Sequence, residues 1–209
     1  MWPEPSPTLE LLNKIAAGDR EAINALLERH RAALRRLVEL RLDHRLTQRV
    51  DASDVVQDVF LEAHGRLEDY LRSPQLPFHL WLRHLAQDRM IDLHRQHHAL
   101  RRDVSRERVM EAGSAEDASV LNLAAQLVAT DLTPAAAALR NEMQQRFLQA
   151  LTQLGTEDQE ILTLRHAEQL ANSDVAQVLN LSPAAAGMRY LRALRRLRSL
   201  LGTDESLPS

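Results

Sequence analysis

Apolar residues recur at helical spacing along most of the chain. In the stretch after residue 18 they fall three or four positions apart, as on one face of an α-helix: Ala22, Ile23, Leu26, Leu27, Leu34, Leu37 and Val38. Four stripes of this kind predict helices over residues 9–17, 19–38, 51–70 and 78–93. The apolar pattern of the fourth helix ends in the polar run 94–108. These helices together predict a bundle-like domain over residues 1–106.

Residues at the ends of these stripes are typical of helix termini. Asp19 and Asp51 precede the second and third stripes, where a carboxylate can accept hydrogen bonds from the free backbone N–H groups of the first turn. Gly18 follows the first stripe and can adopt the left-handed conformation that often ends a helix. The sequence therefore predicts helix starts as well as helix faces.

A second helical unit follows a change in composition. Over residues 107–133 the periodicity weakens and small, acidic and polar residues collect, as in EAGSAEDAS, which predicts a flexible linker. Beyond it, the pattern predicts helices over residues 134–151, 156–167, 172–179 and 182–201. The second domain is thus expected to span residues 134–201, with a disordered tail over 202–209.

The last two helices of this unit are predicted to form a helix-turn-helix. Only Asn180 and Leu181 separate a short helix from a long one. Asn172 or Ser173 is expected to cap the short helix, and Ser182 to cap the long one, with a proline at its first position.

The long helix carries many arginines and no acidic residue. If Ala186, Tyr190 and Leu194 face the core together with Leu197, its basic residues point largely outward: Arg189, Arg192, Arg195, Arg196 and Arg198. Such a helix fits the major groove of DNA while its arginines hold phosphates. The alternative is a solvated amphipathic helix in a helical hairpin.

The composition supports a helical fold and excludes several classes of protein. The chain has 209 residues, of which 44% are hydrophobic and 26% charged, enough to bury a core. Six glycines and 3% aromatic residues disfavour a β-sandwich or barrel, and the lack of cysteine excludes disulfides and thiolate metal sites. The fold class is therefore predicted as all-α, with two small helical domains joined by a flexible linker. No apolar run is long enough to span a membrane and MWPEPSPTLE lacks the features of a secretion signal, so a cytoplasmic location is expected.

Three aspartates lie on one face of the third helix. Asp51, Asp54 and Asp58 are spaced i, i+3 and i+7, which suits a magnesium site, a solvated cap region or a docking face for a basic partner helix. No glycine-rich phosphate loop or nucleophile motif accompanies them. No catalytic residue, metal or cofactor is therefore predicted, and the histidines of the polar run are interpreted as a polar face.

The fourth helix combines aromatic and basic residues. Single-strand binding proteins use aromatic rings to stack bases and basic groups to follow phosphates, and the segment PFHLWLRHLAQDRMIDLHRQHHALRRD has both. Taken alone, Phe78 and Trp81 are more readily explained as core residues.

Three segments resemble one family, in the family's order. DASDVVQDVFLEAHGRL resembles the DAEDLVQEVFLRAWRRL-type motif of extracytoplasmic-function sigma factors of bacterial RNA polymerase. FHLWLRHLAQDRMIDLHR is similar to their F-x-x-W-L-x-x-I-A-x-N-x-x-I-D-x-x-R segment, and LSPAAAGMRYLRALRRLR to their promoter-reading helix. The resemblance implies a sigma factor that directs core polymerase to promoters, without catalysis of its own.

The resemblance also implies roles for individual residues. Docking on the polymerase clamp helices would fall to Asp51, Asp54, Gln57 and Asp58. Melting and reading of the downstream (minus-ten) promoter element would fall to Trp81, Gln87, Asp88 and Arg95. Reading of the upstream (minus-thirty-five) element, beside the polymerase flap, would fall to Ser182, Ala184, Ala185, Arg189, Arg192 and Arg196.

The sequence departs from the family pattern at three positions. Ser53 stands where the docking motif has its second acid, Asp88 replaces the usual asparagine, and Gly187 replaces a lysine of the reading helix. A phosphate on Ser53 would restore the missing charge. The hypothesis is that a Ser/Thr kinase activates the protein at Ser53; an anti-sigma factor is the alternative regulator.

Two rival functions remain open at this point. A helix-turn-helix repressor would bind DNA without docking on polymerase, and a magnesium-dependent enzyme would use the three aspartates. Core polymerase and promoter DNA are the partners expected here, and no membrane.

Overall fold

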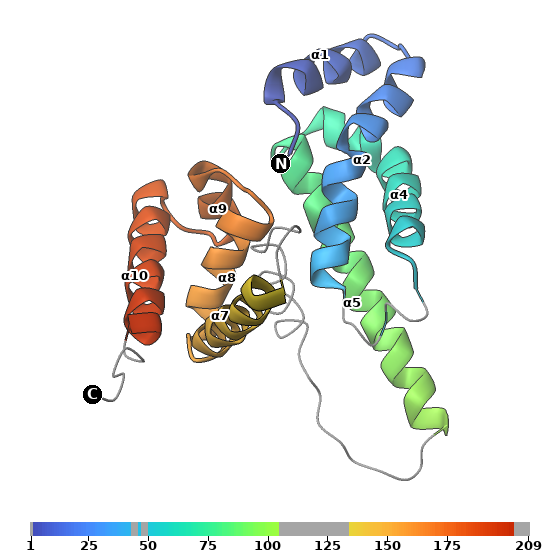
Figure 1. Ribbon diagram of the computed structural model, residues 1–209. Helices are drawn as coiled ribbons and strands as arrows, with labels where there is room; N and C mark the ends of the chain where they lie inside the picture. Colours follow the sequence, from blue (N-terminus) through green and yellow to red (C-terminus); the bar gives the residue numbers. More distant parts are fainter. Residues whose placement is uncertain (1, 43–45, 47–49, 105–133, 203–209) are drawn as a thin grey trace, which may run out of the picture. The chain divides into compact units, whose positions relative to one another are not determined.

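All regular structure in the described part of the chain is helical. The computed structural model describes residues 2–42, 46, 50–104 and 134–202 (Figure 1). The chain divides into two compact units, Met1–Ala112 and Gly113–Ser209. The all-α prediction is therefore confirmed. The predicted linker 107–133 and residues 203–209 of the predicted tail lie outside the described residues, whereas Gly202 is still part of the last helix.

The first unit is built from four helices. They are α1 (Pro5–Ala16), α2 (Glu21–Arg41), α4 (Ala52–Arg72) and α5 (Phe78–Val104). Helices α2, α4 and α5 each pack against the other two, and α1 packs on α2 (Figure 1). Their apolar stripes meet in one core that includes Leu34, Val59 and Leu82, all fully buried.

The predicted end residues bond to the helix ends of this unit, although the residue directly before α2 is Arg20 rather than Asp19. Asp19 Oδ1 accepts hydrogen bonds from the backbone N–H groups of Glu21, at 3.0 Å, and Ala22, at 3.2 Å. Asp51 Oδ1 accepts the N–H of Ser53 at 2.7 Å. Gly18 has a φ of 97°, the left-handed conformation expected after α1.

Two predicted helix limits were wrong. Helix α1 begins at Pro5 rather than at residue 9, because proline is tolerated in the first turn, where its missing N–H would have no helical partner. Helix α5 continues to Val104 through the polar run that was expected to end it. That run contains no proline or glycine, so nothing in it interrupts the backbone hydrogen bonds.

An aromatic cluster closes one end of the core of the first unit. Tyr70 stacks on Trp81 with ring centroids 4.7 Å apart, and its hydroxyl donates to the carbonyl of Leu76 at 3.0 Å. The rings of His30 and Phe78 are in an edge-to-face arrangement with their centroids 5.1 Å apart, and His30 is 1% exposed. The prediction that Phe78 is a core residue is confirmed, and Trp81 is partly buried against the same core.

The second unit has a smaller, mostly aliphatic core. It consists of α7 (Pro134–Thr152), α8 (Thr156–Leu162), a π-helical segment η1 (Thr163–Ala167), α9 (Asn172–Val178) and α10 (Pro183–Gly202). Helix α10 packs against α7, α8 and α9. The buried apolar residues of the unit are Ala150, Leu151, Leu154, Ile161, Leu162, Leu164, Leu170, Val175, Ala176, Ala186, Ala193 and Leu197.

The segment predicted as one helix over residues 156–167 changes type half-way. From Thr163 the turns widen, and the carbonyl of Thr163 accepts the N–H of Glu168, five residues on, at 3.0 Å. Gln169 then takes a φ of 55°, which turns the chain toward α9. No helix in the described residues is long and apolar enough to cross a membrane.

Candidate functional site

The acidic residues of α4 form the first candidate surface, which we call the aspartate face: Asp51, Asp54, Gln57 and Asp58. Asp51 is fixed as the N-cap, and hydrogen bonds from the backbone N–H and hydroxyl of Ser53 lower the pKa of its carboxyl. Asp54 and Gln57 are exposed, and Asp54 lies in the first turn, where negative charge is favourable. Two carboxylates and one amide of this face are thus open to a partner.

Asp58 is used differently, because it is part of an ion pair between two helices. Its Oδ2 accepts from Arg89 Nη2 at 2.6 Å and from Nε at 3.0 Å. This pair ties α4 to α5. The sequence spacing placed Asp58 on the aspartate face but gave no sign of its partner on another helix.

A groove runs beside the aspartate face, between α2 and α4. It is lined by Asn24, Ala25, Leu27, Glu28, Arg31, Gln57, Phe60, Leu61 and His64. The guanidinium of Arg31 lies over the ring of Phe60, 5.0 Å from its centroid. Sequence reasoning missed this groove; the available signal was Leu61, a large apolar residue on the otherwise polar face of α4 and 73% exposed.

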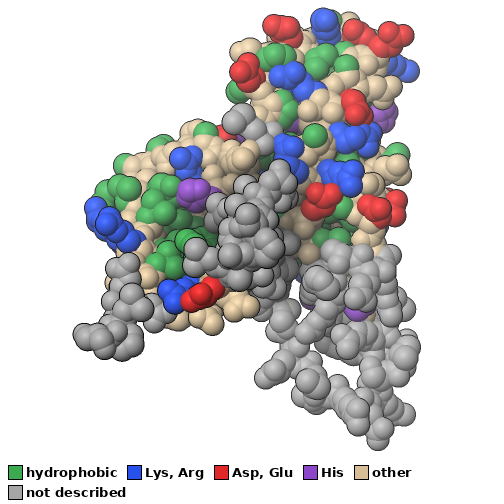
Figure 2. Space-filling model, viewed as in Figure 1, with side chains coloured by type: hydrophobic (Ala, Val, Ile, Leu, Met, Phe, Trp, Pro, Cys, Tyr) green, Lys and Arg blue, Asp and Glu red, His purple; other side chains and the backbone are tan. Residues whose placement is uncertain are grey.

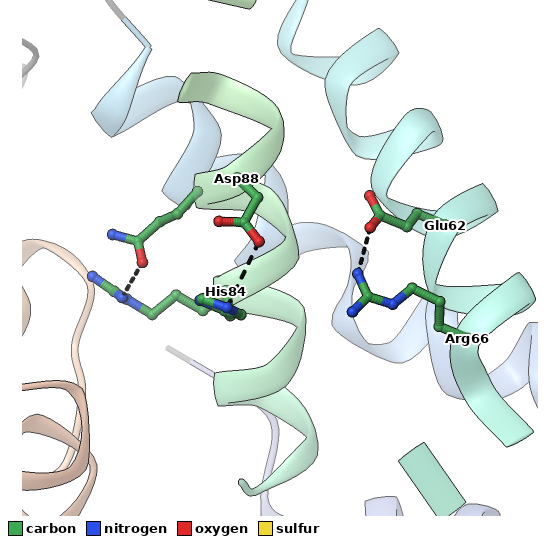
Figure 3. A network of polar contacts seen from close by, with 6 residues as sticks. Glu62, Arg66, His84 and Asp88 are labelled. Atoms are coloured by element: carbon green, nitrogen blue, oxygen red, sulfur yellow. Dashed lines mark hydrogen bonds and ion pairs between the residues drawn. The ribbon is translucent and has the colours of Figure 1, made fainter. Parts of the chain in front are cut away.

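The predicted reading residues of α5 are exposed or half-buried along one stretch of helix. Trp81, Asp88 and Arg95 are spaced i, i+7 and i+14, so they lie on one side of α5. Figure 3 shows Asp88 pointing back along the helix to His84, whose Nε2 is 3.6 Å from its Oδ2. Arg83 Nη1 donates to Gln87 Oε1 at 2.8 Å. Gln87 and Asp88 are therefore each oriented by a residue one turn earlier in α5.

The described residues contain no cluster of three or more histidine, aspartate or glutamate side chains that could hold a metal ion. On the aspartate face, one of the three carboxylates that a magnesium site would need is already paired with Arg89.

The helix-turn-helix is formed by α9 and α10. Asn180 takes a φ of 51° in the turn, and the hydroxyl of Ser182 accepts the N–H of Ala185 at 3.2 Å, which confirms Ser182 as a cap. The expected caps of α9 were wrong, since the residue before this helix is Ala171. Asn172 instead donates from Nδ2 to the carbonyl of Pro183 at 2.8 Å, so it joins the start of α9 to the start of α10.

The arginines of α10 fall into two groups. Arg196 pairs with Asp158 of α8, whose side chain is only 7% exposed, and Arg189 Nη2 lies 3.4 Å from Glu157. The expectation that the five arginines point largely outward is correct for Arg196, which is 63% exposed, whereas Arg189 is only 24% exposed. Both are paired because the acidic first turn of α8 packs beside α10. Arg192, Arg195 and Arg198 are exposed and form no ion pair within the described residues. They are the free charges of this helix.

A polar contact between η1 and α10 also went unpredicted. The Tyr190 hydroxyl lies 3.1 Å from His166 Nε2, and the guanidinium of Arg165 is 5.3 Å from the centre of the Tyr190 ring. Burial and the charge of Arg165 lower the pKa of His166. Together with Asn172, these residues fix how α10 sits on the elements before it.

Both units match families of known proteins. Residues 26–99 match Sigma-70 region 2, and residues 144–197 match Sigma-70 region 4. The first match contains the aspartate face and the reading residues of α5. The second contains α8 to α10 almost entirely.

Individual relatives match most of the chain. The RNA polymerase sigma factor CnrH of Cupriavidus metallidurans is 29% identical, with 93% of this chain and 94% of CnrH covered. The ECF RNA polymerase sigma factor BldN of Streptomyces coelicolor is 24% identical, with 94% and 66% covered. A solved structure of CnrH in complex with the cytosolic domain of CnrY is similar with a TM-score of 0.52 and 26% identity, covering 93% of this chain and 97% of that one.

Proposed function

The chain belongs to the sigma-70 family, in its extracytoplasmic-function group, and is an RNA polymerase sigma factor directing promoter-specific transcription; we propose that its two units divide this work between different contacts. The first unit docks on the clamp helices of core polymerase and captures the melted downstream element. The second reads the upstream element beside the polymerase flap. The protein acts as a binding factor in the cytoplasm, with no catalysis of its own.

One observation carries this proposal: the free arginines of a capped helix-turn-helix. Ser182 fixes the start of α10, and Arg192, Arg195 and Arg198 remain exposed along it. A helix with a fixed start and unpaired guanidinium groups suits the major groove, where the arginines hold phosphates on either side.

For polymerase docking, Asp51, Asp54 and Gln57 supply the contacts. Their charge and exposure suit a basic helical surface. Asp58 has a positioning role, because its bond to Arg89 holds α4 against α5. The residues proposed for docking thus lie on or next to α4 and those proposed for base capture on α5, and the Asp58–Arg89 ion pair joins these two helices.

For strand opening, α5 presents its aromatic and polar residues to unstacked bases. Trp81 has one ring face against Tyr70, and the polar groups of Gln87 and Asp88 are oriented by Arg83 and His84. Capture of flipped bases offsets an unstacking cost of a few kcal/mol each. Arg95 follows on the same side of the helix and suits a phosphate of the captured strand.

Two forms of regulation are proposed, and each has its own surface. CnrH is solved in complex with the cytosolic domain of CnrY, and we propose that an anti-sigma factor binds this chain in a similar way. We assign such a partner to the groove between α2 and α4, whose lining includes the exposed Leu61. Alternatively, a Ser/Thr kinase modifies Ser53, which is partly exposed in the first turn of α4. Its phosphate would face the helix N-terminus, which is favourable, but also the Asp51 carboxylate, which is not.

The proposal is tested with full-length chain bound to core polymerase. Arg192→Ala is expected to weaken promoter binding about equally on all sequences and to lower the slope of log affinity against log salt by about one. Arg146→Ala is the matched control, since this exposed arginine of the same unit is paired with Glu142. An unchanged slope for Arg192→Ala removes this residue from the DNA contact.

The two rival functions give different results in the same preparation. A repressor would bind a palindromic site as a dimer and would not assemble with core polymerase. A magnesium-dependent enzyme would show turnover that Asp51→Asn and Asp54→Asn abolish. Assembly with core polymerase and promoter-dependent transcription would contradict both rivals.

A further inference from the structure

The exposed start of α10 has an unusual chemistry for a helix that reads DNA. Besides Pro183 at its first position, the exposed residues of its first two turns are Ala184, Ala185 and Met188, and Met188 is 53% exposed. We call these three residues the apolar strip. The Ser182 hydroxyl is engaged with the N–H of Ala185. None of the three side chains of the strip can form a hydrogen bond with a base.

The other residues at this end of α10 that could form a hydrogen bond with a base do not present a free polar group there. Arg189 is held near Glu157 and its side chain is only 24% exposed. Gly187, where the family has a lysine, faces α9: a Cβ at this position would lie 3.8 Å from Oδ1 of Asn172. We therefore expect the first two turns of α10 to contact DNA bases through carbon atoms.

Basic residues lie next to the apolar strip and indicate which kind of partner binds to it. Arg192 lies one turn beyond Met188 and Arg195 about two turns, both exposed and unpaired within the described residues. Basic and hydrophobic side chains adjoin around α10 on the visible face of this unit (Figure 2). A partner that is apolar at the tip of the helix and anionic along its side matches the major groove, where thymine 5-methyl groups lie between two rows of phosphates.

We propose that the apolar strip recognises thymine methyl groups in the upstream promoter element, with Met188 as the principal specificity residue. Met188 has an unbranched, flexible side chain that can follow a methyl group in the groove. Ala184 and Ala185 allow the backbone of α10 to come close to the base edges. This inference rests on the proposed function and names the chemistry that its second unit reads.

The test removes single methyl groups from the DNA. Full-length chain is assembled with core polymerase, and a promoter is selected from duplexes with a randomised upstream region. Each thymine there is then replaced in turn by deoxyuridine, which lacks only the 5-methyl group. At one or two positions the replacement is expected to weaken binding about fourfold, the effect of losing one buried methyl group.

Variants of Met188 connect that loss to the residue. Met188→Ala should weaken binding to the unmodified promoter by a similar factor and make it insensitive to deoxyuridine at the same position. Met188→Leu, which keeps an apolar side chain, should retain the sensitivity. Met143→Ala is the matched control, because this methionine of α7 is also exposed and lies on another helix.

The outcomes separate the inference from the function on which it rests. Failure to assemble with core polymerase, or to select any promoter, overturns the proposed function and this inference with it. A selected promoter that tolerates every deoxyuridine, or a Met188→Ala protein with undiminished methyl sensitivity, overturns the inference alone. So does weaker assembly of Met188→Ala with core polymerase at unchanged methyl sensitivity, because the strip would then contact the polymerase.

Discussion

Helices α4 and α10 each carry a row of like charges, and the two rows are divided differently between the fold and the surface. On α4 the internally paired residue is Asp58, and both it and Arg89 remain partly exposed. On α10 Arg189 and Arg196 are both paired, and Asp158, the partner of Arg196, is almost fully buried. The Asp58–Arg89 ion pair thus adds little to the stability of the first unit, which has a large core. The Arg196–Asp158 ion pair contributes more to the second unit, which has a small core.

The comparison shows that charge content alone does not reveal which residues a helix offers to a partner. An unpaired exposed charge gains when an opposite charge arrives, whereas a charge already paired must first lose its partner. Asp54 and Arg192 belong to the first kind. Asp58 and Arg196 belong to the second.

The largest effect is expected from reversing a free charge of α4. Asp54→Arg should reduce binding to core polymerase at least a hundredfold, because it sets like charge against a basic surface at a cost of several kcal/mol. Pull-down with core polymerase measures the loss, and circular dichroism verifies the fold. Glu68→Arg, at an exposed position near the other end of the same helix, is the control and should bind normally. Equal binding by both variants would remove the aspartate face from the interface.

The next effect concerns the acid stability of the first unit. Burial, with the charges of His79 and Arg29, lowers the pKa of His30 from 6.5 to about 4. Between pH 6.5 and 4 the unfolded chain binds a proton at this histidine and the folded chain does not. The free energy of unfolding therefore decreases as the pH falls from 6.5 toward 4, by up to about 3 kcal/mol. Its only hydrogen bond in the described residues, to the Thr8 hydroxyl at 3.2 Å, links it to α1.

His30→Gln tests this explanation. Glutamine can keep a hydrogen bond to Thr8 but does not titrate, so the fall in stability over this pH range should become shallower. Denaturant unfolding followed by tryptophan fluorescence isolates the first unit, because Trp2 and Trp81 both belong to it. An equally steep fall in the variant would assign the acid sensitivity to other groups.

A smaller effect separates the two internal ion pairs. Arg196→Ala leaves the buried Asp158 without its partner and should destabilise the second unit by about 2 kcal/mol. Arg89→Ala leaves a half-exposed Asp58 and should cost the first unit about 1 kcal/mol or less. Circular dichroism should detect the first change and tryptophan fluorescence should not. Equal costs would contradict the difference drawn between the units.

The smallest effect is expected at Ser53. Ser53→Glu should raise promoter-dependent transcription about twofold to threefold with purified core polymerase, because one added charge at an exposed site changes a binding energy by less than about 1 kcal/mol. Ser53→Ala should behave like the unmodified protein in vitro and fail to be activated in cells. If both variants behave like wild type in both settings, control by phosphorylation is excluded and an anti-sigma factor is the regulator.

Local signals in the sequence were sufficient for most of the helices. Asp19, Asp51 and Ser182 act where their side chains meet the nearest free N–H groups, within three residues of themselves. Such short-range chemistry depends on little besides the sequence. The predicted start of α1 and the predicted end of α5 were wrong. Proline and polar residues were taken to interrupt a helix at positions where the helical backbone accommodates them.

The candidate site was predictable only as far as it depends on one helix. Spacing placed Asp54 and Arg192 on outward faces, but the partners of Asp58 and Arg196 are 31 and 38 residues away along the chain. No periodicity reveals such pairs, since they arise from packing between helices. The groove between α2 and α4 and the bond from Asn172 to Pro183 were missed for the same reason.

The π-helical segment η1 has a consequence for how this protein can change in evolution. A widened turn holds one residue more than an α-helix needs, so deleting a single residue from Thr163–Ala167 would restore ordinary helical bonding. It would also rotate everything after it by about 100° about the helix axis. The side chains of η1 that meet α10 would then point elsewhere. Insertions and deletions here are therefore constrained more tightly than substitutions, because they turn the reading helix itself.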